Sequence, residues 1–308
     1  MSQTEVFNSG VVLVFKKIAM IAIRLWGRLG NQLFQYSFGR ALSERTGEAL
    51  YFYVLEKTIG NESVSLSNFN GKIKFLKPHE IKSFYHFYGS DLLVRIERKL
   101  TSILPLIHRR IYIEKRTGYT KIAPTSAVCY DGYWQSYRYF SEIADQLRQE
   151  LKPEESVVLP AGLVGEISGS TSVAVHIRRD DYLSRSNRSI YGYCGPDYYR
   201  RAIGHISGKV PDASFFVFSD DIEWVSRNFT FFPEETIYVA HTPDPSDCID
   251  ISLMRKCRHN IIANSTFSWW GAFLGDQKDK IVIAPESWYI NMPGFIISDL
   301  IPSGWILM

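Results

Sequence analysis

The chain of 308 residues has few cysteines and no long hydrophobic run, and both absences narrow the kind of protein it encodes. Its four cysteines form no CxxC pair and have no histidine at zinc-finger spacing, which argues against a disulfide scaffold and a structural zinc site. The apolar stretches Gly10 to Phe15 and Ile18 to Ile23 are far shorter than the roughly 20 residues that span a membrane. A signal peptide is not expected either, because a lysine pair interrupts these stretches early. We therefore expect a cytoplasmic protein with reduced thiols.

The chain also has no large excess of positive or negative charge, and it has no internal repeats. Basic residues number 35 and acidic residues 32, so the formal net charge of +3 is too small to favour nucleic acid as a partner. Without repeats or heptads, a solenoid or coiled coil is excluded. What the chain does have is 45% hydrophobic and 14% aromatic residues, a globular composition with enough length for two domains.

The first half of the chain opens with a strand, a glycine turn, a helix and a second strand. The periodicity predicts these elements at Ile18 to Leu25, Gln32 to Arg45 and Ala49 to Val54. The turn Gly27-Arg28-Leu29-Gly30-Asn31 brings backbone N–H groups to a helix N-terminus, although it is neither a Walker loop nor a dinucleotide fingerprint. A further strand is predicted from Val128 to Trp134 and a helix from Tyr139 to Leu151.

The second half alternates strands and helices regularly after Pro153, Pro160 and a Gly/Ser-rich stretch, so we place a domain boundary between residues 160 and 161. Five strands are predicted at residues 172–177, 214–219, 236–240, 260–263 and 280–284, separated by helices at 197–207, 222–229, 247–256 and 267–274. This alternation predicts an α/β fold with a doubly wound parallel sheet. Ligands bind outside the carboxyl ends of such strands, so the residues that follow them are candidate site residues.

Polar side chains follow four of these strands. They are His176-Ile177-Arg178-Arg179-Asp180-Asp181, Ser219-Asp220-Asp221, His241-Thr242 and Asn264-Ser265-Thr266. Arginines and a histidine supply charge for a phosphate, and the hydroxyls and N–H groups at a helix start suit the same anion. Together they predict a nucleoside-diphosphate site. Each residue also has a structural interpretation that involves no ligand. His176 can be a core residue, the arginines can pair with neighbouring aspartates, and Ser265 and Thr266 can be ordinary helix caps.

Five sequence motifs, in this order over residues 27 to 272, resemble those of the α-1,2-fucosyltransferases of glycosyltransferase family 11. They are Gly27-Arg28-Leu29-Gly30-Asn31-Gln32-Leu33-Phe34-Gln35-Tyr36, Gly132-Tyr133-Trp134-Gln135-Ser136, His176-Ile177-Arg178-Arg179-Asp180-Asp181-Tyr182, Phe218-Ser219-Asp220-Asp221 and Asn264-Ser265-Thr266-Phe267-Ser268-Trp269-Trp270-Gly271-Ala272. The family often has glycine where this chain has Asp180, so Asp181 is taken as the aspartate of the motif. The histidine-arginine motif is shared with other fucosyltransferase families and therefore supports the donor more firmly than the acceptor.

The resemblance implies a GT-B-like enzyme, in which two Rossmann-like domains face each other across a cleft. Residues 1–160 would form the acceptor-side domain and residues 161–308 the domain that binds the GDP-sugar. The implied reaction is an inverting, metal-independent transfer of L-fucose from GDP-β-L-fucose to the 2-hydroxyl of a terminal β-galactoside, in surface polysaccharide or O-antigen synthesis. No cofactor is implied, because GDP-fucose is a co-substrate.

Negative charge accumulates on the GDP β-phosphate as the anomeric C–O bond breaks, so an enzyme of this kind must stabilise it. No Asp-x-Asp motif is present to hold a metal, which favours cationic side chains and a helix N-terminus. Arg178 is the expected partner of the β-phosphate. The other donor-binding residues expected from the resemblance are Arg28, His176, Arg179, Asp220, Asn264, Ser265, Thr266 and Ser268.

Catalytic and acceptor roles are expected for four further residues. Asn31 would orient the reactants without ionising, and Asp181 is the candidate base, with a salt bridge as its alternative. Trp134 and Gln135 are expected to contact the acceptor sugar, because aromatic faces stack on pyranose C–H surfaces; core packing is the alternative for Trp134.

Other interpretations of function and partners remain open. One is a transferase for another GDP-sugar or linkage, and another is a non-catalytic nucleotide- or carbohydrate-binding protein. Animal family members begin with a membrane anchor that this sequence lacks, which indicates a bacterial member. Peripheral contact with the inner face of a membrane, through Lys16-Lys17 or the basic stretches at Arg95 to Lys99 and Arg109-Arg110, is an alternative to scattered surface charge.

Overall fold

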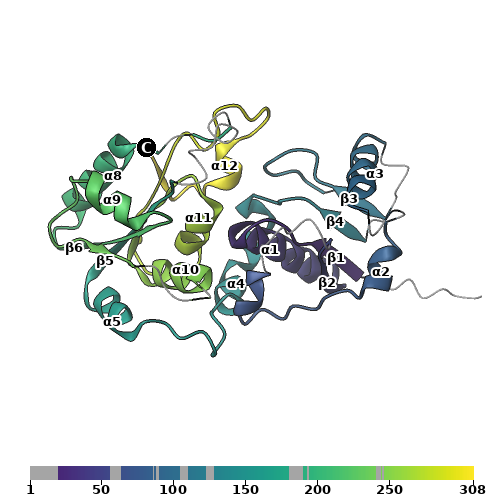
Figure 1. Ribbon diagram of the computed structural model, residues 1–308, viewed down its shortest axis with the longest axis horizontal. Helices are drawn as coiled ribbons and strands as arrows, with labels where there is room; N and C mark the ends of the chain where they lie inside the picture. The colour runs from purple at the N-terminus through teal and green to yellow at the C-terminus, as the bar shows by residue number, and fades with distance from the viewer. Residues whose placement is uncertain are drawn as a thin grey trace, which may run out of the picture.

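The computed structural model describes residues 20–55, 64–85, 87, 90–104, 110–122, 128–179, 190–192, 194–240, 244 and 246–308. These residues form an α/β protein with two parallel sheets, one in each half of the chain (Figure 1). The fold class predicted from the alternation of strands and helices is confirmed. No helix in the described ranges is long and apolar enough to cross a membrane.

The N-terminal sheet has four parallel strands in the order β2-β1-β4-β3. They are β1 (Met20–Arg24), β2 (Ala49–Tyr53), β3 (Ile111–Ile113) and β4 (Cys129–Asp131). Ile21 and Ile23 of β1 enter one core cluster and Ala22 enters another, because successive side chains of a strand point to opposite faces. Both faces of β1 are covered, which explains its uninterrupted apolar sequence.

Helices and short 3-10 turns surround this sheet. They are α1 (Leu29–Thr46), η1 (Ser65–Asn68), α2 (Pro78–Lys82), α3 (Asp91–Ile103), η2 (Tyr137–Tyr139), η3 (Ser141–Ile143) and α4 (Ala144–Glu150). Helix α1 ends at Gly47, whose left-handed φ of 70° lets its N–H donate to the Ser43 carbonyl. A glycine at this position terminates the helix without a Cβ clash.

The C-terminal sheet has six parallel strands in the order β10-β9-β8-β5-β6-β7. The strands are β5 (Thr171–Ile177), β6 (Ala213–Ser219), β7 (Ile237–Tyr238), β8 (His259–Ile261), β9 (Val282–Ala284) and β10 (Ile306–Leu307). The helices are α5 (Ala161–Gly169), α8 (Pro196–Lys209), α9 (Ile222–Asn228), α10 (Ser246–Lys256), α11 (Thr266–Phe273) and α12 (Ile297–Leu300). Apolar residues of α8 and α9 pack in one core cluster, and those of α10 and α11 pack in another, so the sheet is doubly wound.

The sequence predicted the position of most longer elements and missed several short ones, among them β3, β10, α2, α5 and α12. Strands β3 and β10 have only three and two residues, too few for a periodic signal. Helix α5 lies where the Gly/Ser-rich composition indicated a linker. The domain boundary at residues 160 and 161 falls directly before α5 and stays a prediction.

One apolar cluster joins the two halves of the molecule, which Figure 1 shows with α1 beside α11. The ring of Phe34 on α1 lies 4.6 Å from the ring of Trp269 and 5.0 Å from that of Trp270, both on α11. The Trp270 indole N–H donates to the Gly30 carbonyl at 3.0 Å. The two halves are therefore fixed against each other along these two helices.

Candidate functional site

The strand order places a switch point in the C-terminal sheet, where two adjacent strands lead to opposite edges, and the N-terminal sheet faces it with the loops after β1 and β4. In the C-terminal sheet the connections run outward in opposite directions from β5 and β8, so a crevice forms beyond their carboxyl ends. In the N-terminal sheet β1 connects outward to β2, whereas β4 is the last strand and is reached inward from the edge strand β3. Because α1 follows β1 and α11 follows β8, the α1–α11 contact brings the loops after β1 and β4 to the mouth of the crevice.

Two helix N-termini meet at this cleft. Arg28 is the N-cap residue of α1 and Ser265 is that of α11. A Cβ atom built on Gly30 would lie 2.6 Å from Thr266 Oγ1 and 2.7 Å from the backbone nitrogen of Phe267, so only glycine allows this approach. Helix N-termini carry partial positive charge and unpaired N–H groups. Their pairing makes a site for an anion.

Arg178 adds a full positive charge between the helix starts. It follows β5 directly and its Nη1 donates to Ser265 Oγ at 3.0 Å. Arg178 and Arg28 line the same two cavities, together with Thr266. The junction of the cavities thus combines two guanidinium groups with two helix N-termini, which suits a diphosphate.

The smaller cavity, of about 140 Å³, lies on the β5 and β6 side of the junction. Two phenylalanines, one imidazole and several carboxylates line it: His176, Phe218, Phe267, Asp220, Asp247 and Asp250. Burial, with the charge of Arg178 as a second cause, lowers the pKa of His176 to about 3, so its ring is neutral. Among the described residues, none forms a hydrogen bond with His176 Nδ1. Apolar rings and hydrogen-bond acceptors side by side fit a flat heterocycle that carries N–H groups.

The larger cavity, of about 380 Å³, lies between the two sheets. Its aromatic lining residues are Tyr133, Tyr191, Trp288 and Tyr289. Gln135 Nε2 donates to Asn31 Oδ1 at 2.9 Å, and the Tyr289 hydroxyl lies 3.1 Å from Gln135 Oε1. Among the described residues that line this cavity, none is Asp, Glu or His. Flat faces bordered by amide groups are typical of sugar sites.

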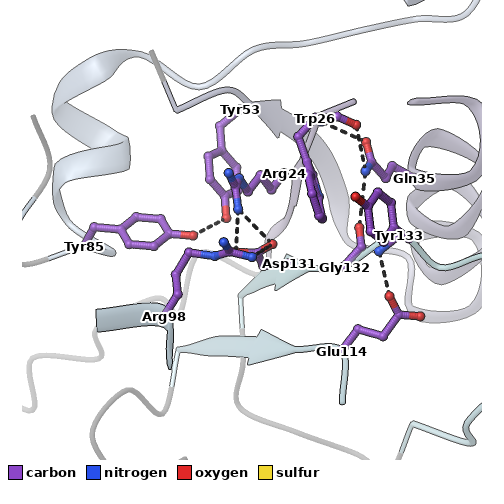
Figure 2. Close-up of polar contacts among 10 residues, drawn as sticks. All are labelled: Arg24, Trp26, Gln35, Tyr53, Tyr85, Arg98, Glu114, Asp131, Gly132 and Tyr133. Carbon is purple, nitrogen blue, oxygen red and sulfur yellow. Dashed lines mark hydrogen bonds and ion pairs between the residues drawn. The ribbon is translucent and has the colours of Figure 1, made fainter. Parts of the chain in front are cut away.

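Gln35 and Glu114 hold the loops after β1 and β4 in place (Figure 2). Gln35 is buried on α1; its amide contacts the backbone of Trp26 and donates to the Gly132 carbonyl at 3.3 Å. Glu114 Oε2 accepts the N–H groups of Tyr133 at 2.6 Å and Trp134 at 3.2 Å. Burial is the main cause that raises the pKa of Glu114, to about 7. These contacts present Tyr133 and Gln135 to the cavity.

A buried ion-pair cluster lies behind the same loops (Figure 2). Asp131, at the end of β4, is contacted by Arg24 Nη1 at 3.2 Å and by Arg98 Nε at 2.5 Å. The carboxylate is fully buried and Arg24 is only 1% exposed. Both guanidinium groups lie over the ring of Trp26, whose centroid is 4.0 Å from that of Tyr133. The cluster therefore supports the stacked pair that borders the larger cavity.

The structure brings together several of the residues predicted from the sequence. Arg28, Asn31, Gln135, Arg178, Asn264 and Thr266 line the larger cavity, while His176 and Asp220 line the smaller one. Ser265 contacts Arg178. Asn264 also has a structural task, because its Nδ2 donates to the carbonyls of Gly192 and Trp288. Asp181, its neighbour Asp180, and His241 and Thr242 lie outside the described residues.

Two predicted residues are buried away from both cavities, which corrects the expectation that they contact a ligand. Trp134 is 1% exposed and stacks on Phe38 with ring centroids 4.0 Å apart, so the core-packing alternative holds. Ser268 is fully buried, and its hydroxyl lies 3.3 Å from the carbonyl oxygen of Ser265.

Arg179 is turned away from the two cavities. It forms an ion pair with Asp221 and its guanidinium lies 3.7 Å from the centre of the Trp224 ring. Its backbone N–H donates to Asp220 Oδ1 at 2.9 Å. In this position Arg179 fixes the rim of the smaller cavity, and its predicted contact with the donor stays a prediction.

Sequence reasoning missed several cavity residues. Tyr133 stands inside a motif, but the sequence prediction assigned the sugar contact to its neighbour Trp134. Alternation along an extended segment would place residues 133 and 135 on one side, but Trp134 has a left-handed φ of 57°, so the pattern alone gives no firm signal here. Tyr191, Trp288, Tyr289 and the aspartates of α10 gave no such signal. In the part of the chain that the structure describes, no group of three His, Cys, Asp or Glu residues could hold a metal ion.

Comparison with known proteins gives a consistent picture. A family model described as Glycosyl transferase family 11 matches residues 9–293. The chain is 31% identical over 280 residues to the alpha-1,2-colitosyltransferase of Escherichia coli, covering 88% of this chain and 93% of that protein. It is 29% identical over 289 residues to the O-antigen biosynthesis glycosyltransferase WbnK of Escherichia coli, covering 86% and 93%. It is also 25% identical over 264 residues to the galactoside 2-alpha-L-fucosyltransferase Sec1 of Mus musculus, covering 83% and 64%.

Proposed function

This chain belongs to glycosyltransferase family 11, and we propose that it transfers L-fucose from GDP-β-L-fucose to the 2-hydroxyl of a terminal β-galactoside. The observation that carries the proposal is the junction of two cavities at Arg28, Arg178 and Thr266. The name of the mouse relative supports L-fucose as the transferred sugar and the 2-position of a galactoside as the point of attachment. The name of WbnK supports a surface glycan of the O-antigen type as the acceptor.

The donor would lie across the junction, with its guanosine in the smaller cavity. Phe218 and Phe267 flank that cavity, and the neutral His176 adds an apolar ring face. Asp220, Asp247 and Asp250 supply acceptors for the N–H groups of a guanine or the hydroxyls of a ribose. The diphosphate then lies at the junction, and the fucose enters the larger cavity.

The junction would stabilise the leaving group. As the anomeric C–O bond breaks, charge moves onto the β-phosphate, where Arg28, Arg178 and two helix N-termini are already in place. Fixed donors of this kind stabilise a transition state by about 3 to 4 kcal/mol each, because they do not reorganise during the reaction. With this arrangement we propose that no metal ion is required.

The acceptor galactose would stack on the aromatic side of the larger cavity, where Tyr133 and Tyr289 lie. Asn31 and Gln135 are already hydrogen-bonded to each other there, so they can position a sugar hydroxyl without ionising. Inversion requires the acceptor oxygen to attack from the face opposite the departing GDP. We propose Asp181 as the base that takes its proton, because it follows Arg178 by three residues and no described lining residue of this cavity is a carboxylate.

A second donor deserves a direct comparison, because one relative is named an α-1,2-colitosyltransferase. Colitose lacks the 3-hydroxyl group of fucose but keeps the same ring, so both donors present the same diphosphate to the junction. A site built to bind the 3-hydroxyl would reject the deoxy sugar strongly, since its polar partner would be left unpaired. Transfer rates from GDP-fucose, GDP-colitose and GDP-mannose separate these cases.

The experiment is GDP release in excess EDTA, with and without lactose or N-acetyllactosamine. The wild type, Arg178→Ala and the control Arg227→Ala are compared; Arg227 is an exposed arginine on α9 that pairs with Glu223. We expect acceptor-dependent release from the wild type and the control, and a loss on the order of a thousandfold for Arg178→Ala. The product should carry an α-1,2 linkage by NMR.

Each alternative has its own result. Near-wild-type transfer by Arg178→Ala would remove this residue from the mechanism. If the protein bound GDP but released no GDP from any of the donors with any acceptor, this result would support a non-catalytic binding protein. A different linkage in the product would agree with the proposed donor site and would contradict transfer to the 2-hydroxyl group.

A further inference from the structure

Exposed apolar side chains gather on one helix far from the cleft. Among the described residues, seven of the thirteen exposed large apolar side chains lie between residues 87 and 104, on α3 and its flanks. They are Phe87, Leu92, Leu93, Ile96, Leu100, Ile103 and Leu104, with exposures from 41% to 68%. Single exposed apolar residues are normal on a protein surface, but a contiguous group of this size marks an interaction site.

The apolar residues of α3 form one continuous strip. At about 100° per residue, the side chains at positions 92, 93, 96, 100, 103 and 104 fall within an arc of about 120°. Val94 and Thr101 lie on the opposite side and are buried. The helix is therefore apolar on its solvent side and packed on its protein side.

The protein side of α3 is held firmly, so the exposed strip does not result from a detached helix. Val94 belongs to the core cluster that covers the outer face of the N-terminal sheet. Arg98 forms two hydrogen bonds with the buried Asp131, and Glu97 Oε2 accepts the N–H of Phe87. Figure 1 shows α3 beside β3 at the end of the molecule away from the C-terminal sheet.

Positive charge is also concentrated in the part of the sequence that contains α3. Residues 82–116 contain eight basic and three acidic residues, a formal net charge of +5, whereas the whole chain carries only +3. Arg95 and Lys99 are exposed and lie on the α3 surface directly beside the apolar arc. Of the three acidic residues in this segment, Glu97 is only 4% exposed. Arg98 is paired with Asp131, and Arg116 lies 3.9 Å from Asp299, so the exposed positive charges on α3 itself are Arg95 and Lys99.

We propose that α3 docks on an anionic lipid bilayer, with its apolar strip in the boundary between head groups and acyl chains and Arg95 and Lys99 against the lipid phosphates. Amphipathic helices with basic borders bind membranes in this way, parallel to the surface. At about 20 Å, a helix of 13 residues is long enough to lie in the interface and too short to cross the bilayer. Charge complementarity favours a lipid surface over a second copy, which would bring like charges together.

Docking through α3 has a consequence for the cleft that rests on the proposed function. Arg98 connects the inner side of α3 to Asp131, and the residues that follow Asp131 carry Tyr133 and Gln135 to the larger cavity. The acceptor side of the cleft would then be held at a fixed distance from the bilayer. A glycan attached to a membrane lipid is the kind of acceptor that this arrangement favours.

The test is sedimentation of the full-length protein with vesicles of phosphatidylcholine, alone and with about 30% phosphatidylglycerol. Four proteins are compared: the wild type, Ile96→Ser with Leu100→Ser, Arg95→Gln with Lys99→Gln, and a control. The control is Val158→Ser with Leu307→Ser, which removes exposed apolar side chains away from α3. Affinity for GDP, measured in parallel, reports that each variant is folded.

We expect the wild type and the control to bind the anionic vesicles at least tenfold more tightly than the neutral ones. Each α3 variant should lose about tenfold or more, with GDP affinity unchanged. Equal vesicle binding by the wild type and the Ile96/Leu100 variant would overturn the proposal, as would no binding at all. A dimer in solution that dissociates in this variant would show that a second copy covers the strip. Because no donor or acceptor is present, failure of the proposed reaction does not affect these results.

Discussion

Gly30→Ala tests the close approach of α1 and α11, on which the junction depends. In an open helix position, alanine is more stable than glycine by about 1 kcal/mol. At Gly30 the new Cβ would lie 2.7 Å from both the Thr266 carbonyl carbon and the Phe267 nitrogen, which are backbone atoms that cannot rotate away. Overpacking of this kind costs about 1 to 3 kcal/mol. The net effect is therefore a loss of up to about 2 kcal/mol instead of a gain of about 1 kcal/mol.

The matched control is Gly204→Ala on α8, where a Cβ would meet no atom within 4 Å. The same chemical change should stabilise the protein there by up to about 1 kcal/mol. Urea unfolding measures both variants, and we expect their midpoints to move in opposite directions from that of the wild type. GDP affinity provides a second measurement: separating the helix starts should weaken it about tenfold in Gly30→Ala and leave it unchanged in Gly204→Ala.

One result would refute this account of the junction. If Gly30→Ala were as stable as Gly204→Ala and bound GDP with wild-type affinity, the N-termini of α1 and α11 would not be in contact. The anion site would then have to be built from α11 and Arg178 alone.

Three further predictions concern buried charges. Asp131→Ala should lower the free energy of unfolding by about 3 to 5 kcal/mol, because Arg24 stays buried without its carboxylate partner. The control Asp145→Ala, which removes an exposed ion pair, should lower it by under about 1 kcal/mol. Urea unfolding measures both variants. The pKa of His176 is lowered from 6.5 to about 3, so below pH 6.5 the unfolded chain binds a proton that the folded chain does not. Wild-type stability should consequently fall by about 2 kcal/mol more than that of His176→Phe between pH 6.5 and pH 5, and equal pH dependence would contradict the burial of this ring. The pKa of Glu114 is raised from 4.5 to about 7, so the folded chain keeps a proton that the unfolded chain has lost. Stability should decrease as pH rises from 4.5 to 7, and the decrease should be smaller in Glu114→Gln when unfolding is followed at both ends of this range.

Much of the smaller cavity and of the junction could be predicted from the sequence, because their residues follow strands with a strong periodic signal. Alternating strands and helices fixed the parallel order of the second half, and the switch-point rule then pointed to Arg178 and Thr266. The pairing of β5 with β8 brings these two residues to one edge, which the structure confirms.

The larger cavity was harder to predict, because its shape depends on single backbone angles and on distant contacts. Trp134 has a φ of 57°, and this conformation directs its ring toward Phe38 while Tyr133 faces the cavity. Nothing local in the sequence indicates that Glu114, 19 residues before Tyr133, holds this turn. The wall formed by Trp288 and Tyr289 likewise depends on tertiary packing, since these residues follow no long strand.

The core that α1 and α11 share bears on how such enzymes diverge. Where two domains meet only through a linker, one half can be exchanged between relatives to combine a new donor with an old acceptor. Here Phe34 of the first half packs against Trp269 and Trp270 of the second. A chimera would have to inherit both faces of that contact together. Changes of donor or acceptor should therefore arise through substitutions in the lining of the cleft, and recombination of halves should be a poor route to new specificity.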